Sequence, residues 1–395
     1  MAKIQRLALA AQAFRPSAPV DRYAMLAGRR TKLLEIVGAV SQPGRHVALY
    51  GERGVGKTSI TNILAEIFDA PDLPDFAWAR VNCNTEDNFG SLWRTIFREL
   101  GTEVGDDLSP EDVRYTLARR DTPAVIVIDE LDRLDDDPSL TLLADTIKSL
   151  SDHVVHSTLV LVGVATSLDE LVGEHGSIER ALVQVEMPRM SPEELLEIVE
   201  KGCAMVELSS LPTAAHSMAS LSEGLPHYTH LLGYHATQRV IQDDRKEITT
   251  ADVDAAIHQA VETHTIKSDY QRATRSTRSE TLYPDVLLAC ALAQKDTLGA
   301  FPAGAIRDPL KRITGTEYAI PAFAPHLKKF LEPERGSVLW RDGEPRRYFY
   351  RFANPLMQPY VILHALAERK IDDAVLTEMV GTTSEDGPSE PQPLF

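Results

Sequence analysis

The chain has 395 residues, of which 25% are charged and 43% hydrophobic, and its formal net charge at pH 7 is −17. Such fractions are typical of a globular protein with two or three domains, and no apolar run reaches the ~18 residues needed to cross a bilayer. The acidic balance excludes a protein that coats nucleic acid, because phosphate repels a negative surface. The first residues lack a cleavage signal, so we expect a cytoplasmic protein with no membrane partner.

The N-terminal segment, residues 1–27, contains Pro16 and Pro19 among scattered apolar residues. This composition indicates an extended arm that lies against the next domain. A helix with one apolar face is expected from Thr31 to Val40, and the residues after it, Gln-Pro-Gly, end it.

Residues 46–60, HVALYGERGVGKTSI, contain the phosphate-loop pattern G-x-x-x-x-G-K-[ST] directly after a run of strand formers. Glycines let backbone N–H groups turn toward phosphates, and the helix that follows presents its positive end to the same anion. We expect Lys57 to contact the β- and γ-phosphates of ATP and the Thr58 hydroxyl to hold Mg²⁺. The predicted nucleotide-binding residues of the loop are Gly51, Glu52, Arg53, Gly54, Val55, Gly56, Lys57, Thr58 and Ser59.

Two further strands are expected at Ala77–Asn82 and at Ala124–Glu130. The second is a continuous apolar run that ends on two acids, which suits a central strand of a parallel sheet. Ligands in such sheets bind beyond the carboxyl ends of the strands. Asp129 is therefore predicted to reach the Mg²⁺ held by Thr58, and Glu130 to polarise the water that attacks the γ-phosphate. The alternative is an acidic helix cap.

A fourth strand is expected at Thr158–Val164 and a fifth at Leu182–Met187. The hydroxyl of Thr166, just after the fourth strand, is a candidate to reach the γ-phosphate or the attacking water. The alternative is an ordinary helix cap. A surface loop that includes Arg180 leads into the fifth strand.

From Ser191 the sequence becomes helical, starting with the capping box Ser-Pro-Glu-Glu. The predicted helices of this small lid are Ser191–Val206, Pro212–Leu221, Leu225–Ile241 and Thr249–Thr265. A polar, proline-free linker follows.

Three helices and then two strands are expected after the linker: Leu282–Gln294, Ala303–Ile313, Ile320–Leu331, Ser337–Trp340 and Tyr348–Phe352. This is the order of a winged helix-turn-helix. Residues 267–351 carry 15 basic and 10 acidic residues, a net charge of +5 in an otherwise acidic chain. The candidate contacts to double-stranded DNA are Lys328, Lys329, Arg346 and Arg347. The alternative is a solvated basic face.

With these features in order, the chain resembles the AAA+ ATPases, and among them the origin-recognition initiators, over roughly residues 14–365. The motifs that carry the resemblance are GERGVGKTS and VIVIDELDRL. It implies an α/β P-loop fold, with a three-layer αβα base around a parallel sheet, a helical lid and a C-terminal winged helix. It also implies that Gly28 and Arg29 lie beside the adenine, that Thr166 is sensor 1, and that Arg180 is the finger that reaches a neighbouring subunit's ATP.

The lid departs from the initiator pattern, because the place of the sensor-2 arginine is taken by His227 in Gly-Leu-Pro-His. This spelling is similar to the GLP motif of the STAND signalling ATPases, in which the proline packs by the adenine. Pro226 and His227 are therefore candidate nucleotide contacts. A STAND-like signalling or anti-phage defence ATPase, whose winged helix contacts a protein effector, is one alternative. A transposition-regulator ATPase and a non-enzymatic binding module are two others.

The predicted function is an ATP-hydrolysing, Mg²⁺-dependent switch that forms homo-oligomers with ATP and acts through the winged helix, on DNA. The expected domains are an N-terminal arm (1–27), an AAA+ base (28–190), a helical lid (191–266), a linker (267–281), the winged helix (282–365) and a disordered acidic tail (366–395).

Overall fold

The computed structural model describes residues 2–70, 75–164, 178–276, 281–296, 299–344 and 347–372. The chain divides into two compact units. Residues Arg15–Gly202 form the base unit, and Met1–Phe14 together with Cys203–Phe395 form the C-terminal unit. Among the described residues, no helix has both the length and the apolar character that a membrane span requires.

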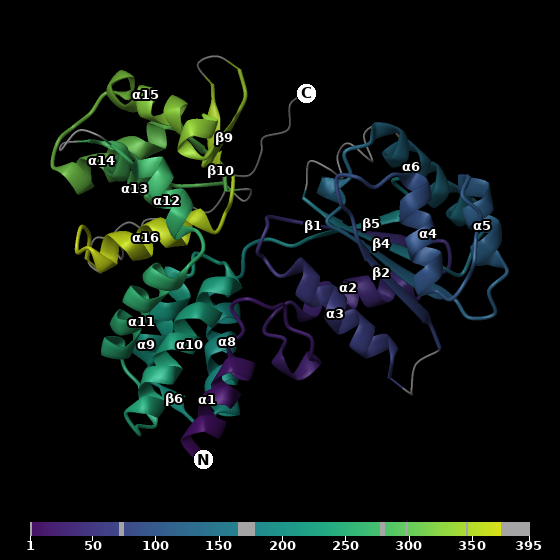
Figure 1. Ribbon diagram of the computed structural model, residues 1–395, viewed down its shortest axis with the longest axis horizontal. Helices are drawn as coiled ribbons and strands as arrows, with labels where there is room; N and C mark the ends of the chain where they lie inside the picture. Colours follow the sequence, from purple (N-terminus) through teal and green to yellow (C-terminus); the bar gives the residue numbers. More distant parts are fainter. Residues whose placement is uncertain are drawn as a thin grey trace, which may run out of the picture. The chain divides into compact units, whose positions relative to one another are not determined.

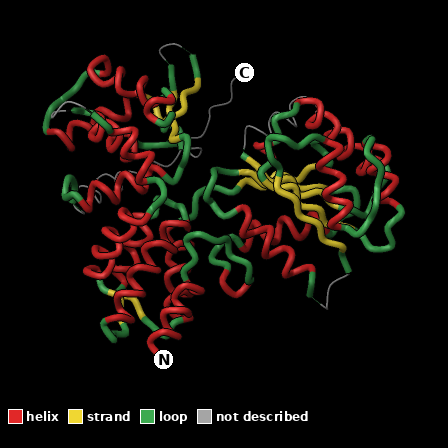
Figure 2. The backbone as a smooth tube through the Cα atoms, viewed as in Figure 1, coloured by secondary structure: helices red, strands yellow, loops and turns green. Residues whose placement is uncertain are grey.

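The base unit is built on a sheet of five parallel strands in the order β2-β3-β4-β1-β5 (Figures 1 and 2). The strands are β1 (His46–Tyr50), β2 (Ala77–Asn82), β3 (Ala124–Asp129), β4 (Thr158–Gly163) and β5 (Leu182–Glu186). Every residue of β3 and β4 is buried, as suits central strands covered on both faces. The five predicted strands are confirmed to within one residue at each end.

Helices cover both faces of this sheet, so the base unit has three layers (Figure 1). One face carries α2 (Arg30–Val40) and α3 (Lys57–Phe68), and the other carries α4 (Phe89–Glu99), α5 (Pro110–Ala118) and α6 (Asp137–Asp152). Asn88 and Ser91 form a capping box at the start of α4, and the fully buried Trp93 and Phe97 anchor that helix in the core. The predicted α/β fold class is confirmed, whereas α6 was not predicted.

The C-terminal unit begins in sequence with a helix, where an extended arm was expected. Residues Ala2–Ala13 form α1, which packs along α10 (Pro226–Gln242). The ring of Phe14 is fully buried, and a Cβ atom at Gly233 would lie 2.4 Å from it. Ala10 and Ala13, the buried residues of α1, have small side chains that suit this close contact, and Pro16 and Pro19 lie beyond the helix.

The remaining lid helices agree with the prediction. They are α8 (Pro192–Met205), which leads out of the base unit, α9 (Pro212–Leu221) and α11 (Thr250–Thr263). A two-stranded parallel pairing of β6 (Ser209–Ser210) with β7 (Glu247–Ile248) joins the loops between them. The predicted linker starts with a helix, α12 (Lys267–Thr274).

The last part of the C-terminal unit has the order helix, strand, helix, helix, strand, strand, and then a final helix. Its elements are α13 (Tyr283–Leu292), β8 (Phe301–Pro302), α14 (Arg307–Thr314), α15 (Ile320–Phe330), β9 (Leu339–Asp342), β10 (Phe349–Phe352) and α16 (Met357–Ala367). The strands form an antiparallel sheet in the order β8-β10-β9. β8 and α16 were not predicted. From residue 373 the predicted acidic tail lies outside the described residues.

Candidate functional site

The phosphate loop lies between β1 and α3, at the carboxyl edge of the sheet. Gly51 must be glycine because a Cβ atom there would lie 2.2 Å from the carbonyl oxygen of Met187. Gly56, the residue before α3, has a φ of +99°, a conformation that favours glycine. The loop is thus held against the end of β5, with the N-terminus of α3 free of a side-chain cap. This arrangement suits an anion at the helix start.

Lys57 is the first residue of α3, and its side chain turns back over the loop. Its Nζ atom donates hydrogen bonds to the carbonyl oxygens of Gly51, at 2.8 Å, and of Glu52, at 2.9 Å. Burial lowers the pKa of Lys57 to about 8, although the carboxylates of Asp132 and Asp129 act in the opposite direction. A half-buried ammonium group held by carbonyl oxygens is well suited to an incoming phosphate, whose charge would compensate for its lost hydration.

The predicted Mg²⁺ ligands lie side by side. The Thr58 hydroxyl donates to the Oδ2 atom of Asp129 at 3.2 Å, and the Asp129 side chain is only 5% exposed. The same Oδ2 atom accepts a hydrogen bond from Nη2 of Arg80 at 2.8 Å. Sequence reasoning missed Arg80, because a lone arginine in the middle of β2 carries no local signal. Its guanidinium group orients the carboxylate and offsets its charge.

A hydroxyl and a carboxylate at this separation fit a Mg²⁺ ion that keeps most of its other ligands from water and from phosphate oxygens. The described residues contain no group of three or more histidine, cysteine or acidic side chains that could hold a metal ion without such help. The site therefore fits Mg²⁺ that arrives together with a nucleotide.

Glu130, the predicted catalytic base, follows Asp129 with a positive φ of 56°. Its side chain is 42% exposed, and its Oε2 atom accepts a hydrogen bond from Arg133 at 3.0 Å. The backbone N–H of Glu130 donates to Asp129 at 2.9 Å. The left-handed conformation ends β3 here and turns the two successive carboxylates in different directions. One is buried beside Thr58, and the other is open to solvent.

The segment predicted to lie beside the adenine is held tightly within the base unit. Gly28 and Arg29 donate their backbone N–H groups to Glu197 at 2.7 Å and to Glu194 at 2.9 Å, both on α8. The Arg29 guanidinium group is buried and donates to the carbonyl oxygens of Pro188 and Val55. Burial lowers the pKa of Arg29. Arg29 thus joins the phosphate loop to the end of β5, a role that the sequence did not reveal.

Two loop residues have partners in the base unit. Arg189 donates to Glu52 at 2.6 Å, and Arg53 lies 3.7 Å from Asp132. The side chain of Val55 is buried. These contacts fix the shape of the loop before a ligand enters.

The two candidates after β4 have different outcomes. Thr166 lies outside the described residues. Arg180 is exposed in the turn before β5. Because β1 and β5 run parallel, with His46 opposite Leu182, this turn is at the amino edge of the sheet, away from the phosphate loop.

The remaining predicted nucleotide contacts belong to the C-terminal unit. Pro226 is the first residue of α10, and His227 follows it. The Nε2 atoms of His227 and His264 are 2.9 Å apart, and the His264 ring stacks on Tyr228. Burial and the neighbouring His227 lower the pKa of His264 to about 4. A contact of Pro226 or His227 with a nucleotide stays a prediction.

The predicted DNA contacts are exposed, as far as they are described. Lys328 and Lys329 lie in the last turn of α15, where Lys329 forms an ion pair with Glu332 at 2.6 Å. Arg347 is exposed before β10. Arg346 lies outside the described residues.

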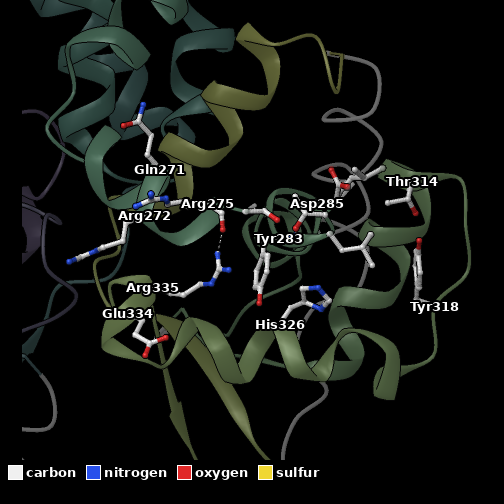
Figure 3. Close-up of a pocket in the computed structure, with 14 residues that line it drawn as sticks. Gln271, Arg272, Arg275, Tyr283, Asp285, Thr314, Tyr318, His326, Glu334 and Arg335 are labelled. Atoms are coloured by element: carbon white, nitrogen blue, oxygen red, sulfur yellow. Dashed lines mark hydrogen bonds between the residues drawn. The ribbon is translucent and has the colours of Figure 1, made fainter. Parts of the chain in front are cut away.

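A cavity of roughly 1580 Å³ in the C-terminal unit is lined by residues of α12–α15 and the turn after α15 (Figure 3). The guanidinium group of Arg335 lies 3.5 Å from the ring centroid of Tyr283 and donates to the carbonyl oxygens of Ala273 and Arg275. Arg335 therefore holds the end of α12 against α13. We assign no ligand, since residues 277–280, between two lining residues, lie outside the described chain.

Comparison with known proteins supports the interpretation of the base unit as a phosphate-loop nucleotide-binding domain. Residues 40–172 match the family model described as an AAA domain. None of the curated proteins that were compared matches the sequence. The phosphate loop and β3 lie within the matched residues.

Two solved structures share the fold. The chain is similar to the Aeropyrum pernix ORC2 protein, with a TM-score of 0.50 and 15% identity over 95% of this chain and 98% of the other. It is also similar to the Walker-type ATPase PABY2304 of Pyrococcus abyssi, with a TM-score of 0.51 and 15% identity over 88% and 99%. The resemblance to AAA+ proteins of the origin-recognition type is confirmed as a likeness of fold, and the likeness to the GLP motif stays a prediction.

Proposed function

We propose that this AAA+ chain is a cytoplasmic ATPase switch, which binds ATP with Mg²⁺, associates with further copies of itself and is reset by hydrolysis. The observation that carries the proposal is the arrangement of Lys57, Thr58 and Asp129 around one loop at the carboxyl edge of the sheet. The A. pernix structure with the same fold is one of ADPNP and ADP complexes, which supports a nucleotide as the ligand.

Each of these residues has a distinct role in hydrolysis. Lys57 exchanges its carbonyl partners for phosphate oxygens, while Thr58 and Asp129 would hold the metal. When bound, Mg²⁺ would neutralise charge that develops on the phosphate oxygens. Glu130 is exposed beside this site, where it can accept a proton from the attacking water once Arg133 moves aside.

The position of Arg180 supports an assembly in which subunits share sites. The five residues of β5 separate it from the carboxyl edge, a span of about 16 Å at ~3.3 Å per residue. Arg180 therefore cannot contact a phosphate in its own loop. Its exposed guanidinium group suits a γ-phosphate bound by a neighbouring copy, as an arginine finger in trans.

The output of the switch is proposed to be duplex DNA binding by a winged helix formed by α13–α15 and the β8-β10-β9 sheet. The order of these elements and the basic charge at the end of α15 support it. A protein effector is the alternative output, and it is favoured by the acidic character of the rest of the chain.

Two substitutions test the ATPase assignment, because Lys57 and Glu130 have different roles. Lys57→Ala should abolish ATP binding, whereas Glu130→Gln should bind ATP and lose turnover. Binding of a fluorescent ATP analogue and phosphate release give the two readouts. The matched controls are Lys148→Ala and Glu99→Gln, which alter exposed residues on α6 and α4 and should behave as the wild type. Wild-type binding and turnover in both test variants would exclude the proposed site.

A further inference from the structure

The small sheet of the C-terminal unit has one buried face and one exposed face. In the register of the sheet, Tyr350 is opposite Phe301 and Arg341, whereas Phe349 is opposite Pro302 and Asp342. Side chains alternate along each strand, so opposite residues share a face. The face of Tyr350 carries the buried side chains of Phe301, Leu339, Tyr350 and Phe352, and the exposed Arg341.

The other face, here called the outer sheet face, is formed by Pro302, Trp340, Asp342, Phe349 and Arg351. Trp340 is 43% exposed and Phe349 is 48% exposed, among the most exposed large hydrophobic side chains described. They belong to adjacent strands, and as diagonal neighbours their Cα atoms lie about 7–8 Å apart. The outer sheet face therefore presents two partly exposed aromatic rings on adjacent strands.

One arginine accompanies the rings of the outer sheet face. The guanidinium carbon of Arg351 lies 4.2 Å from the ring centroid of Trp340. A second pair, Arg341 with Tyr348 at 4.1 Å, does not belong to this face, because Arg341 is opposite Tyr350. Over residues 339–352 the hairpin has four arginines and two acids. The sequence of the hairpin is thus net positive in a chain whose net charge is −17, and Arg351 brings one of these charges to the outer sheet face.

Aromatic rings and guanidinium planes on an exposed sheet are the groups on which unpaired bases stack, while the arginine charge attracts the phosphate backbone. Paired bases are already stacked within the duplex and cannot use such a surface. We propose that the outer sheet face binds single-stranded nucleic acid, with bases stacked on Trp340 and Phe349 and the backbone near Arg351. This goes beyond the proposed function, which concerns duplex DNA, and either can fail without the other.

The chain offers a matched control in the base unit. Tyr115 is 51% exposed, and the guanidinium carbon of Arg119 lies 4.2 Å from its ring centroid. This pair has the same chemistry as Trp340 and Arg351, but it lies on a helix with no second exposed ring on a neighbouring strand. A general attraction of polynucleotides to aromatic–arginine pairs would therefore affect both sites alike.

The test uses the full chain with fluorescein-labelled dT20, U20 and a 20-base-pair duplex, by fluorescence anisotropy at low salt. Trp340→Ala and Phe349→Ala should each weaken binding of dT20 by about 5- to 100-fold, the range that loss of one stacked base gives. Trp340→Phe should retain most of the affinity, and Tyr115→Ala should equal the wild type. Duplex binding should change by less than about twofold in all of them, since its phosphate contacts remain.

A second readout does not depend on the folding of the alanine variants. Binding of dT20 should quench the tryptophan fluorescence of the wild type, and Trp340→Phe should lose the quenching while it still binds. Comparable affinity for U20 would show that the surface does not distinguish RNA from DNA, and a preference for either would identify the natural strand. Three results would overturn the proposal: no binding of dT20 or U20 by the wild type, equal affinity in Trp340→Ala, or equal losses for dT20 and the duplex.

Discussion

The two units of this protein hold their charged groups in different ways. In the base unit, the candidate nucleotide site is built from buried and half-buried groups that are already paired with one another, such as Lys57 with loop carbonyls and Asp129 with Thr58 and Arg80. In the C-terminal unit, Lys328 and Arg347 are exposed on the surface. A site whose groups are already held in place selects one kind of ligand before the ligand arrives. On an exposed surface, the partner decides which side chains make contacts.

Because the site of the base unit is already formed, substitutions in this unit should change the rate of ATP turnover by orders of magnitude. Outside the phosphate loop, the largest change is expected from Arg180. Arg180→Ala should leave the nucleotide affinity of the isolated subunit nearly unchanged and lower ATP turnover by about 10³-fold or more, the range of an arginine finger. Steady-state phosphate release and nucleotide titration measure the two quantities.

A mixture of two inactive variants tests whether Arg180 acts on a neighbouring subunit. Arg180→Ala subunits combined with Glu130→Gln subunits should recover part of the activity, because one interface can then contain an intact half of each site. If the mixture stays inactive and the wild type remains a monomer with ATP by light scattering, Arg180 does not act in trans.

Substitutions on the exposed surface should have a smaller and more uniform effect. Changing both Lys328 and Lys329 to Glu should weaken binding of all duplex sequences at least about tenfold and reduce the dependence of log affinity on log salt by about 2, since two phosphate contacts are lost. ATP binding should not change. Gel-shift titrations at several salt concentrations measure both effects. The control is the double change of Lys148 and Lys246 to Glu, which has the same change of net charge at exposed positions elsewhere.

The same variant separates the two proposed outputs. If the winged helix contacts a protein and holds the ATPase shut, the Lys328 and Lys329 changes should leave DNA behaviour as it is and raise basal ATP turnover or oligomerisation. Failure of the wild type to bind any duplex at low salt with ATP would remove the DNA output.

The smallest predicted effect compares two histidines with a lowered pKa, one from each unit. His46 is fully buried in β1, its Nδ1 atom accepts the backbone N–H of Leu159 at 3.0 Å, and burial lowers its pKa to about 3. Below pH 6.5 His46 binds a proton in the unfolded chain but stays neutral in the folded chain. The free energy of unfolding should therefore fall by up to about 1.4 kcal/mol per pH unit as the pH falls from 6.5 toward 3.

The pKa of His264 is lowered to about 4, so His264 also makes the free energy of unfolding fall as the pH falls. Its ring is only partly buried, so this change should be smaller than that from His46. Urea denaturation at pH 7 and pH 5 measures the slope. His46→Gln should flatten it more than His264→Gln does. Equal slopes in His46→Gln and the wild type would show that His46 is accessible to protons in the folded chain.

The sequence by itself determined the phosphate loop, the parallel strands and the lid helices, and the reason is that these signals are local. The loop needs glycines and a lysine at fixed spacing, and strands buried on both faces must be continuously apolar. Even the pair of Thr58 and Asp129, 71 positions apart, could be predicted, because the carboxyl ends of parallel strands meet at one edge.

Only the tertiary structure decided which distant residues support that site. Arg80 on β2 reaches Asp129, and Arg29 reaches the loop, but neither has a neighbour in sequence that marks it. Residues 2–13, the first part of the segment expected to be an extended arm, form the helix α1, and the buried ring of Phe14 that follows lies against Gly233 of α10. The outer sheet face likewise depends on strand register: one residue of slip in β10 would turn Phe349 to the buried face and Tyr350 and Phe352 to the outer one.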